Sequence, residues 1–296
     1  MLKLEGCFTA IITPFKGDRP DLDALRRVVR FQIKNGADGL VPCGSTGEAA
    51  TLSPEEYLEV IKAVVEEAKG RLPVMPGAGT NSTAKSVEMV KKVSALGVDG
   101  LLAIVPYYNK PTQEGMKAHF GEMARATRLP LVLYNIPGRT GVNMLPATAL
   151  ALAGEFSNIV GIKEASGNLD QVSEIVNGAP KGFAVMSGDD SLTLPMMSVG
   201  AKGAISVVSN IAPAQVSRMC GLFREGRADE AAEMHHRLFP LVKNLFVETN
   251  PIPVKYAVSL LGLCGPEPRL PLTPFPQKLR SGLRAAMVKA GIKLPS

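Results

Sequence analysis

The 296-residue sequence predicts an α/β protein built as a (β/α)8 TIM barrel with a C-terminal helical extension. Three observations lead to this prediction. Short apolar segments of strand length recur eight times before residue 212, amphipathic segments lie between them, and only helix-like segments follow. Strands that are apolar on both faces and are separated by helices indicate a parallel sheet covered by helices. An open, doubly wound sheet is the alternative architecture.

The strand candidates are short apolar runs that end near polar or glycine-containing loops. Each run has the length of an ordinary strand and is bounded by turn residues. The eight candidates are Cys7–Ile12, Gly39–Pro42, Pro73–Pro76, Leu101–Val105, Leu131–Tyr134, Ile159–Ile162, Phe183–Met186 and Ala204–Val208.

The helices between these strands have recognisable ends. Ser53 precedes Pro54 and two glutamates, a pattern typical of a capped helix start with acidic residues near the positive end of the dipole. Gly36, Gly70 and Gly97 follow helical segments and indicate left-handed helix ends. Further helix candidates are Asp21–Asn35, Ser82–Leu96, Thr112–Thr127 and Asn168–Val176.

The last third of the chain lacks strand candidates. We therefore expect residues 1–211 to form the barrel core with the active site, and residues 212–296 to form the helical extension packed on it. A proline-rich connection at 266–276 precedes the last, basic helix. The expected helices are Ala212–Glu225, Ala228–Val247, Pro253–Leu261 and Gln277–Ala290.

Composition and charge argue against several classes of function. The formal net charge is +6, but the basic residues are scattered, so nucleic-acid binding is not expected. No apolar run is long enough to span a membrane, and no secretory signal is evident at the N-terminus. Four widely spaced cysteines and three histidines argue against a disulfide scaffold and a histidine-rich metal centre. We expect a cytoplasmic protein without such a metal centre.

Lys163 is the sharpest candidate for chemistry. It closes the predicted strand that begins at Ile159, and in a barrel the carboxyl ends of the strands carry the active site. If its side chain enters the barrel, loss of hydration lowers its pKa and gives a neutral amine that can attack a carbonyl. The alternative is a strand-end lysine paired with a carboxylate at the rim.

Other polar residues follow neighbouring strands. Tyr134 ends the preceding strand and can relay protons near the amine, although a tyrosine in the core with a hydrated hydroxyl is the alternative. The glycine turn that contains Ser45 and Thr46 offers hydroxyls and backbone N–H groups to an anion such as a carboxylate. Arg139, five residues beyond Tyr134, can grip a carboxylate or be an ordinary surface arginine. No serine-hydrolase or dinucleotide motif is present.

Several motifs in order give the sequence a resemblance to the dihydrodipicolinate synthase family, within the N-acetylneuraminate lyase superfamily. The resemblance covers essentially the whole chain. The motifs lie at Phe8–Phe15, Cys43–Glu48, Val105–Thr112, Tyr134–Thr140, Gly161–Ala165, Ser187–Asp190 and Asn250–Lys255.

The resemblance implies a role for each candidate. Lys163 would form an imine with pyruvate, and Tyr134, Ser45 and Tyr108 would form a proton relay, with Tyr108 reaching in from a neighbouring subunit of a homotetramer. Thr46 would join Ser45 in holding the pyruvate carboxylate. Arg139 would hold the carboxylate of the second substrate, L-aspartate 4-semialdehyde, while Gly188 and Ile205 would line the site through main-chain contacts.

The resemblance also implies the reaction and its control. Condensation would give 4-hydroxy-tetrahydrodipicolinate on the route to lysine and diaminopimelate, and Arg139 favours this lyase over the alternative, a pyruvate-dependent aldolase of a sugar acid. A non-catalytic metabolite-binding barrel is the alternative outside enzymes, and the presence of Lys163 and Tyr134 argues against it. Pro54, Tyr57 and Lys85 stand where lysine-inhibited relatives place histidines and a glutamate, so we expect weak or absent inhibition by lysine.

Overall fold

The computed structural model describes residues 2–295, which divide into two compact units. The first unit contains residues 2–6 and 73–205, and the second contains residues 7–72 and 206–295. Strands alternate with helices in the first unit, and in the second unit residues 213–289 contain helices without strands, as the sequence predicts.

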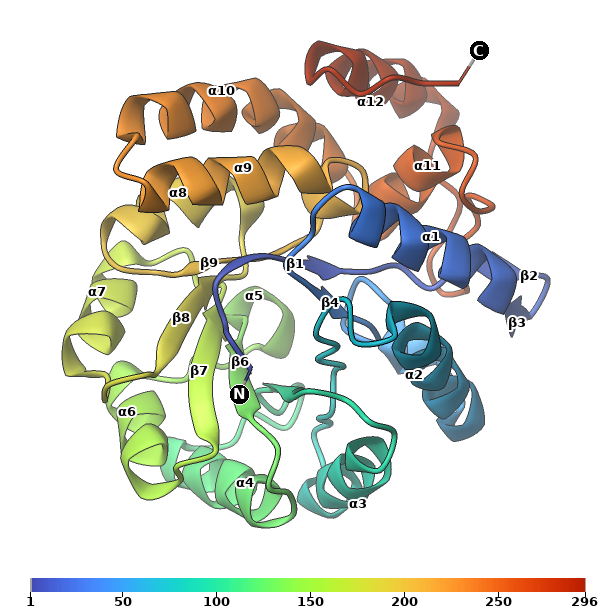
Figure 1. The fold of residues 1–296 in the computed structure, drawn as a ribbon. Coiled ribbons are helices and arrows are strands. Elements are labelled where there is room, and N and C mark those ends of the chain that lie inside the picture. The colour runs from blue at the N-terminus through green and yellow to red at the C-terminus, as the bar shows by residue number, and fades with distance from the viewer. Residues whose placement is uncertain (1, 296) are drawn as a thin grey trace. The chain divides into compact units, whose positions relative to one another are not determined.

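The first unit is built on a parallel sheet in the order β9-β8-β7-β6-β5. Helices α3, α4, α6 and α7 follow one another along the outside of these strands (Figure 1). The strands are β5 (Leu101–Ile104), β6 (Leu131–Asn135), β7 (Ile159–Glu164), β8 (Ala184–Ser187) and β9 (Gly203–Ser206). The helices are α3 (Thr83–Ser94), α4 (Gln113–Arg125), α5 (Pro137–Thr140), α6 (Pro146–Glu155), α7 (Leu169–Gly178) and α8 (Thr193–Ser198), with a short 3₁₀ turn η2 (Asp190–Leu192).

The third predicted strand, Pro73–Pro76, is reduced in the structure. Single bridge residues at Val74 and Gly77 mark its place; Gly77 pairs in parallel with Leu102, and Leu102 N donates to Pro76 O at 2.8 Å. Prolines lack the N–H group that a ladder requires, so Pro73 and Pro76 leave this segment fewer donors. The chain still runs beside β5, but the strand prediction was too long.

The second unit contains parallel strands β1 and β4, the hairpin β2–β3 and the predicted C-terminal helices. Helices α9 and α10 pack together, and α12 lies against α10 (Figure 1). The strands are β1 (Gly6–Ala10), β2 (Phe15–Lys16), β3 (Arg19–Pro20) and β4 (Gly39–Val41). The helices are α1 (Leu22–Lys34), α2 (Pro54–Ala68), α9 (Pro213–Arg224), α10 (Ala228–Leu245), α11 (Ile252–Leu260) and α12 (Gln277–Lys289), with 3₁₀ turns η1 (Ala49–Thr51) and η3 (Val208–Asn210).

The predicted helix ends are confirmed. Ser53 forms a capping box with Glu56, in which the serine hydroxyl accepts from Glu56 N and the glutamate accepts from Ser53 N. Gly36, Gly70 and Gly97 have φ angles of 75°, 71° and 77°, which glycine adopts without steric cost. Local sequence therefore sets where these helices begin and end.

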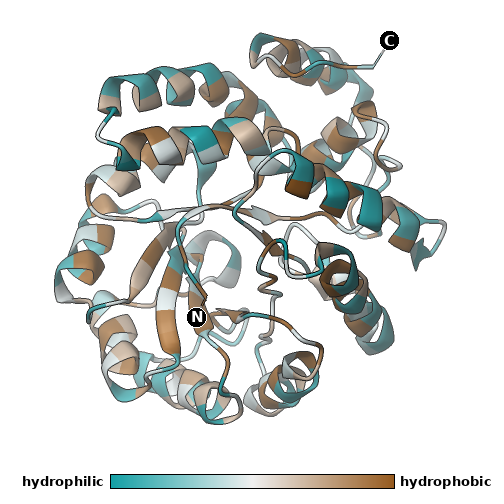
Figure 2. Ribbon diagram, in the orientation of Figure 1, coloured by the Kyte–Doolittle hydropathy of each residue, from teal (hydrophilic) through white to brown (hydrophobic). Residues whose placement is uncertain are grey.

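The strands of the first unit are buried on both faces. Apolar residues run along β7 and β8, whereas hydrophilic residues collect on the helices (Figure 2). Fully buried strands place any polar side chain at a strand end in a desolvated setting. Among residues 2–295 no helix is both long and apolar enough to cross a membrane.

Candidate active site

Lys163 and Tyr134 meet at the carboxyl ends of two neighbouring strands. They are paired in the register of β7 and β6, and Lys163 Nζ lies 4.2 Å from the centroid of the Tyr134 ring. Both are buried, with 6% and 5% of their surface exposed. The structure thus brings the two main candidates together and places the amine away from bulk solvent.

Gly188 leaves room for the lysine side chain. A Cβ at this position would stand 2.9 Å from Lys163 Cε and 2.7 Å from Ala165 Cβ. Gly188 follows β8 directly, and its N–H donates to Glu164 O at 2.7 Å, so its backbone is fixed beside the lysine. Ile205 lies on β9 and is also buried. A larger residue at 188 would displace the aliphatic part of Lys163.

Arg139 and Tyr108 occupy adjacent segments of the first unit. Arg139 lies on α5 with an exposed side chain, and Tyr108 N donates to the carbonyl of its neighbour Thr140 at 3.3 Å. Tyr108 has 89% of its surface exposed and a φ of 74°, the left-handed region that non-glycine residues seldom adopt. Tyr108 therefore projects from a defined loop into solvent.

Ser45 and Thr46 belong to the second unit. Their turn is closed by Gly47 N donating to Gly44 O at 3.1 Å. Thr46 is buried, and its hydroxyl accepts from Asn250 Nδ2 at 2.9 Å. The structure thus groups Lys163, Tyr134 and Gly188 in one unit and Ser45 with Thr46 in the other. That the two groups share one site stays a prediction.

A buried ion pair anchors the end of this turn, and sequence reasoning assigned it no role. Lys255 Nζ lies 2.6 Å from Glu48 Oε1, and the two side chains are 0% and 1% exposed. Lys255 also faces the Phe15 ring at 4.2 Å, while Arg269 N donates to Glu48 Oε2 at 2.8 Å. Burial lowers the pKa of Lys255, and the Glu48 charge opposes that shift. Lys255 is therefore a second buried lysine, but its amine is already paired with the Glu48 carboxylate.

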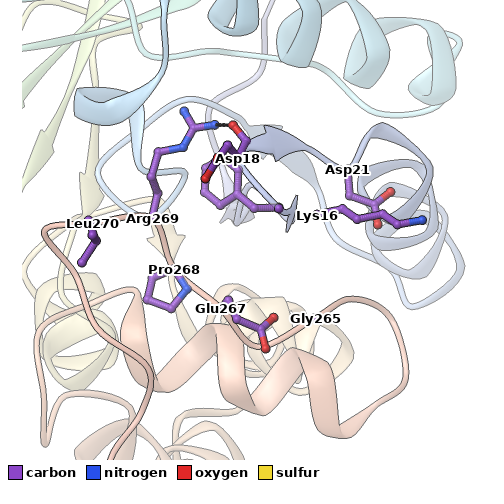
Figure 3. A pocket seen from close by; sticks show the side chains of 10 residues that line it. Lys16, Asp18, Asp21, Gly265, Glu267, Pro268, Arg269 and Leu270 are labelled. Carbon is purple, nitrogen blue, oxygen red and sulfur yellow. Dashed lines mark hydrogen bonds between the residues drawn. The ribbon is translucent and has the colours of Figure 1, made fainter.

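The described residues also form a pocket of about 510 Å³ in the second unit. Arg269 crosses its wall and donates to the backbone carbonyl of Asp18 (Figure 3). Arg269 also makes two hydrogen bonds to Glu56, at 2.7 and 2.8 Å, which hold the pKa of Glu56 at about 2. The guanidinium in this wall is therefore already engaged, and the residues that line the pocket are not those predicted for the site.

Other chemistries find less support in the described part of the chain. Burial raises the pKa of the Cys43 thiol, which disfavours a nucleophilic thiolate beside the glycine turn. Within residues 2–295 no three His, Cys, Asp or Glu side chains gather as a metal site would require. Lys163 remains the side chain best placed for covalent chemistry.

Comparisons with known proteins identify relatives that match nearly the whole chain. A curated relative from Pelobacter propionicus, 4-hydroxy-tetrahydrodipicolinate synthase, is 49% identical over 97% of this chain and 99% of its own. A dihydrodipicolinate synthase structure from Aquifex aeolicus is 44% identical, with a TM-score of 0.97, over 99% of this chain and 100% of that one. The chloride-inhibited dihydrodipicolinate synthase from Acinetobacter baumannii, complexed with pyruvate, is 42% identical, with a TM-score of 0.95, over 98% of this chain and 100% of that one.

Likeness of this extent over the full length confirms the predicted fold class, a (β/α)8 barrel with a C-terminal helical extension. It also excludes the doubly wound sheet. Residues 3–290 match the sequence profile of the Dihydrodipicolinate synthetase family, so the chain belongs to that family.

Proposed function

We propose that this protein condenses pyruvate with L-aspartate 4-semialdehyde to give 4-hydroxy-tetrahydrodipicolinate, a step in lysine and diaminopimelate biosynthesis. The reaction proceeds through a Schiff base on Lys163. The observation that carries the proposal is the buried Lys163 amine at the end of β7, against the ring of Tyr134. Family membership supports the choice of substrates.

The chemistry begins at the ketone of pyruvate. The neutral amine of Lys163 attacks this carbon, and loss of water from the carbinolamine gives an imine. Loss of a methyl proton converts the imine to an enamine, whose carbon attacks the aldehyde of the second substrate. The amino group of that substrate then attacks the imine carbon, closes the ring and releases the lysine amine. No metal or organic cofactor enters these steps.

Each remaining candidate has a part in these steps. Tyr134, Ser45 and Tyr108 relay protons to and from the carbinolamine oxygen. Ser45 and Thr46 hold the pyruvate carboxylate through hydroxyl and backbone donors, and Arg139 holds the carboxylate of the aldehyde. Gly188 and Ile205 contribute main-chain contacts around the bound pyruvate.

The proposal extends to assembly and location. The protein forms a homotetramer made of two dimers, in which Tyr108 completes the site of the neighbouring subunit. The exposed, conformationally defined Tyr108 supports this arrangement. The cysteines, present as thiols, agree with a cytoplasmic location. Residues 1–211 carry the active site, and residues 212–296 form the extension packed on that core.

Borohydride reduction in the presence of pyruvate tests the proposal. We expect a stable pyruvate adduct on the peptide that contains Lys163, and none on the peptide that contains Lys255. Lys163→Met should abolish the adduct and the turnover, whereas Lys202→Met, an exposed lysine of the same unit, should change neither. An adduct at another lysine, or none in the wild-type protein, would rule out the mechanism.

The substrate is tested separately. Turnover with pyruvate and L-aspartate 4-semialdehyde is compared with cleavage of N-acetylneuraminate and of 2-keto-3-deoxy sugar acids. We expect efficient turnover only of the first pair. Preferred cleavage of a sugar acid would retain the Schiff base but replace the proposed substrate.

A further inference from the structure

Glu164, the residue after Lys163, lies at the centre of a buried hydrogen-bond network. Only 1% of its surface is exposed. Its carboxyl oxygens accept from Ser166 N at 2.7 Å, from Gln171 Nε2 at 3.0 Å and from Asn135 Nδ2 at 3.0 and 3.2 Å. Three donor groups therefore bind the Glu164 carboxylate, and Glu164 lies on the same strand, β7, as Lys163.

The strand register relates this network to the candidate active site. Asn135 pairs with Glu164 one step beyond the pair of Tyr134 and Lys163. Because successive strand residues point to opposite faces, the Asn135–Glu164 pair lies on the reverse side of the same two strand ends. Its hydrogen bonds join β6 to β7 directly after the paired residues Tyr134 and Lys163, whose spacing the reaction requires.

The network also reaches the segment that carries Arg139. Asn135 Oδ1 accepts from Met144 N at 3.0 Å, and Asn135 Nδ2 donates to Asn143 Oδ1 at 2.7 Å. Gln171 Nε2 donates to the same Asn143 oxygen at 3.2 Å. The Asn135 side chain thus fixes the far end of the segment that leaves β6 and includes α5.

We infer that Glu164 is a positioning residue for the reaction, which holds Tyr134 at its working distance from Lys163 and, through Asn135, anchors the segment that carries Arg139. The inference rests on the proposed function. Glu164 touches neither substrate; it acts through the residues that do. Displacement of a reacting group by about 1 Å can lower a rate by about a hundredfold. Hydrogen bonds that hold Tyr134 and Lys163 in place should therefore affect turnover directly.

Glu164→Gln is the first test. The amide retains the shape of the side chain but has one acceptor oxygen and an NH2 group, so the three donors cannot all be accepted. We expect turnover to fall about ten- to hundredfold and the KM for the aldehyde to rise more than the KM for pyruvate. The borohydride adduct with pyruvate should still form on Lys163, more slowly than in the wild type.

Turnover is expressed per site that borohydride and pyruvate can label. This measure separates positioning from a loss of folded protein, because a purely structural role would lower the melting temperature and the number of sites but leave turnover per site unchanged. Unchanged turnover per site in Glu164→Gln would overturn the inference. Failure of the wild-type protein to form the adduct would instead overturn the proposed function.

Two further variants complete the design. Gln171→Met removes one hydrogen-bond donor to Glu164 at nearly constant volume. It should lower turnover per site severalfold. It replaces Glu164→Gln as the test if that variant does not fold. Wild-type turnover in a folded Gln171→Met would then count against the inference. Glu174→Gln changes an exposed glutamate on the same helix, α7, and should match the wild type in every measurement.

Discussion

The position of Tyr134 over the lysine amine makes its hydroxyl the first group to test by substitution. Tyr134→Phe preserves the ring that faces Lys163 at 4.2 Å and removes only the hydroxyl, the proposed proton relay. We expect turnover to fall about a hundredfold with little change in the KM for pyruvate, measured by steady-state kinetics.

The matched control is Tyr256→Phe, a tyrosine on α11 that stacks on Phe275. Its turnover should equal that of the wild type. Wild-type turnover in Tyr134→Phe itself would remove this hydroxyl from the mechanism.

His119 on α4 couples folding to pH. It is 4% exposed, and burial lowers its pKa from 6.5 to about 4, with Thr83 Oγ1 at 3.0 Å from Nδ1. The unfolded chain therefore binds a proton on this residue at a higher pH than the folded chain, so stability falls as pH drops from 6.5 towards 4. The difference in pKa corresponds to about 3 kcal/mol over that window.

Replacement of His119 isolates this effect. The melting temperature of the wild type should fall between pH 6.5 and 5, and that of His119→Gln should fall less over the same interval. Glu56, whose pKa is lowered to about 2, loses its contribution only as pH falls from 4.5 towards 2, below this interval. Parallel curves for the two proteins would contradict the assignment to His119.

At the scale of whole elements, the Lys255–Glu48 pair joins α11 to the glycine turn of the same unit. Lys255→Met leaves the Glu48 carboxylate buried with the Arg269 N–H as its remaining donor, so we expect a loss of about 3–5 kcal/mol in the free energy of unfolding. Chemical denaturation measures this loss. Lys92→Met, which breaks an exposed pair with Glu88, should leave the free energy of unfolding nearly unchanged.

A double variant separates the charge from the packing. Lys255→Met combined with Glu48→Gln removes both charges and should recover part of the loss. If the double variant is as unstable as the sum of the single ones, the ion pair is not the cause.

Local patterns predicted those elements whose signal is contained in a short segment. The strand ends that carry Lys163 and Tyr134, and the capped start of α2 at Ser53, were all evident because alternation, capping and parity act over a few residues. Helix α6 was not predicted, since its alanine-rich sequence is apolar on most sides and lacks an amphipathic stripe. The hairpin β2–β3 was missed because each strand has only two residues.

Long-range pairings escaped prediction for a different reason. Glu48 and Lys255 are separated by 207 positions, and nothing local distinguishes Lys255 from a lysine on a solvated helix face. Glu164 was overlooked for another reason: two of its donors, Ser166 and Gln171, lie within seven positions, but only the fold buries the carboxylate and brings Asn135 of β6 to it. Sequence thus indicated which residues stand at strand ends, but not which buried polar groups secure them.

For the molecule as an assembly, complementation between variants tests the role of Tyr108. Lys163→Ala and Tyr108→Phe should each have little activity alone. If Tyr108 completes the site of a neighbouring subunit, mixed oligomers contain sites with both intact residues and should recover activity after co-refolding. No recovery, with mixed oligomers verified by mass spectrometry, would place Tyr108 in its own subunit's site or outside the mechanism.

The response to added L-lysine is a second property to be tested on the whole protein. Lys85, exposed on α3, would repel a cationic effector, and Pro54 and Tyr57 cannot supply the charge that histidine or glutamate would. We expect initial rates to change little with added L-lysine at millimolar concentration. Strong inhibition at sub-millimolar L-lysine would show that other residues bind the effector.

The left-handed backbone at Tyr108 has a consequence for how subunits meet. Such a conformation costs a non-glycine residue on the order of 1–2 kcal/mol, and Lys110, with a φ of 45°, lies in the same region two residues later. That cost is met when the chain folds, so the backbone at Tyr108 is already fixed before any second copy binds. A backbone that is already fixed would lose little conformational entropy in the proposed contact between subunits.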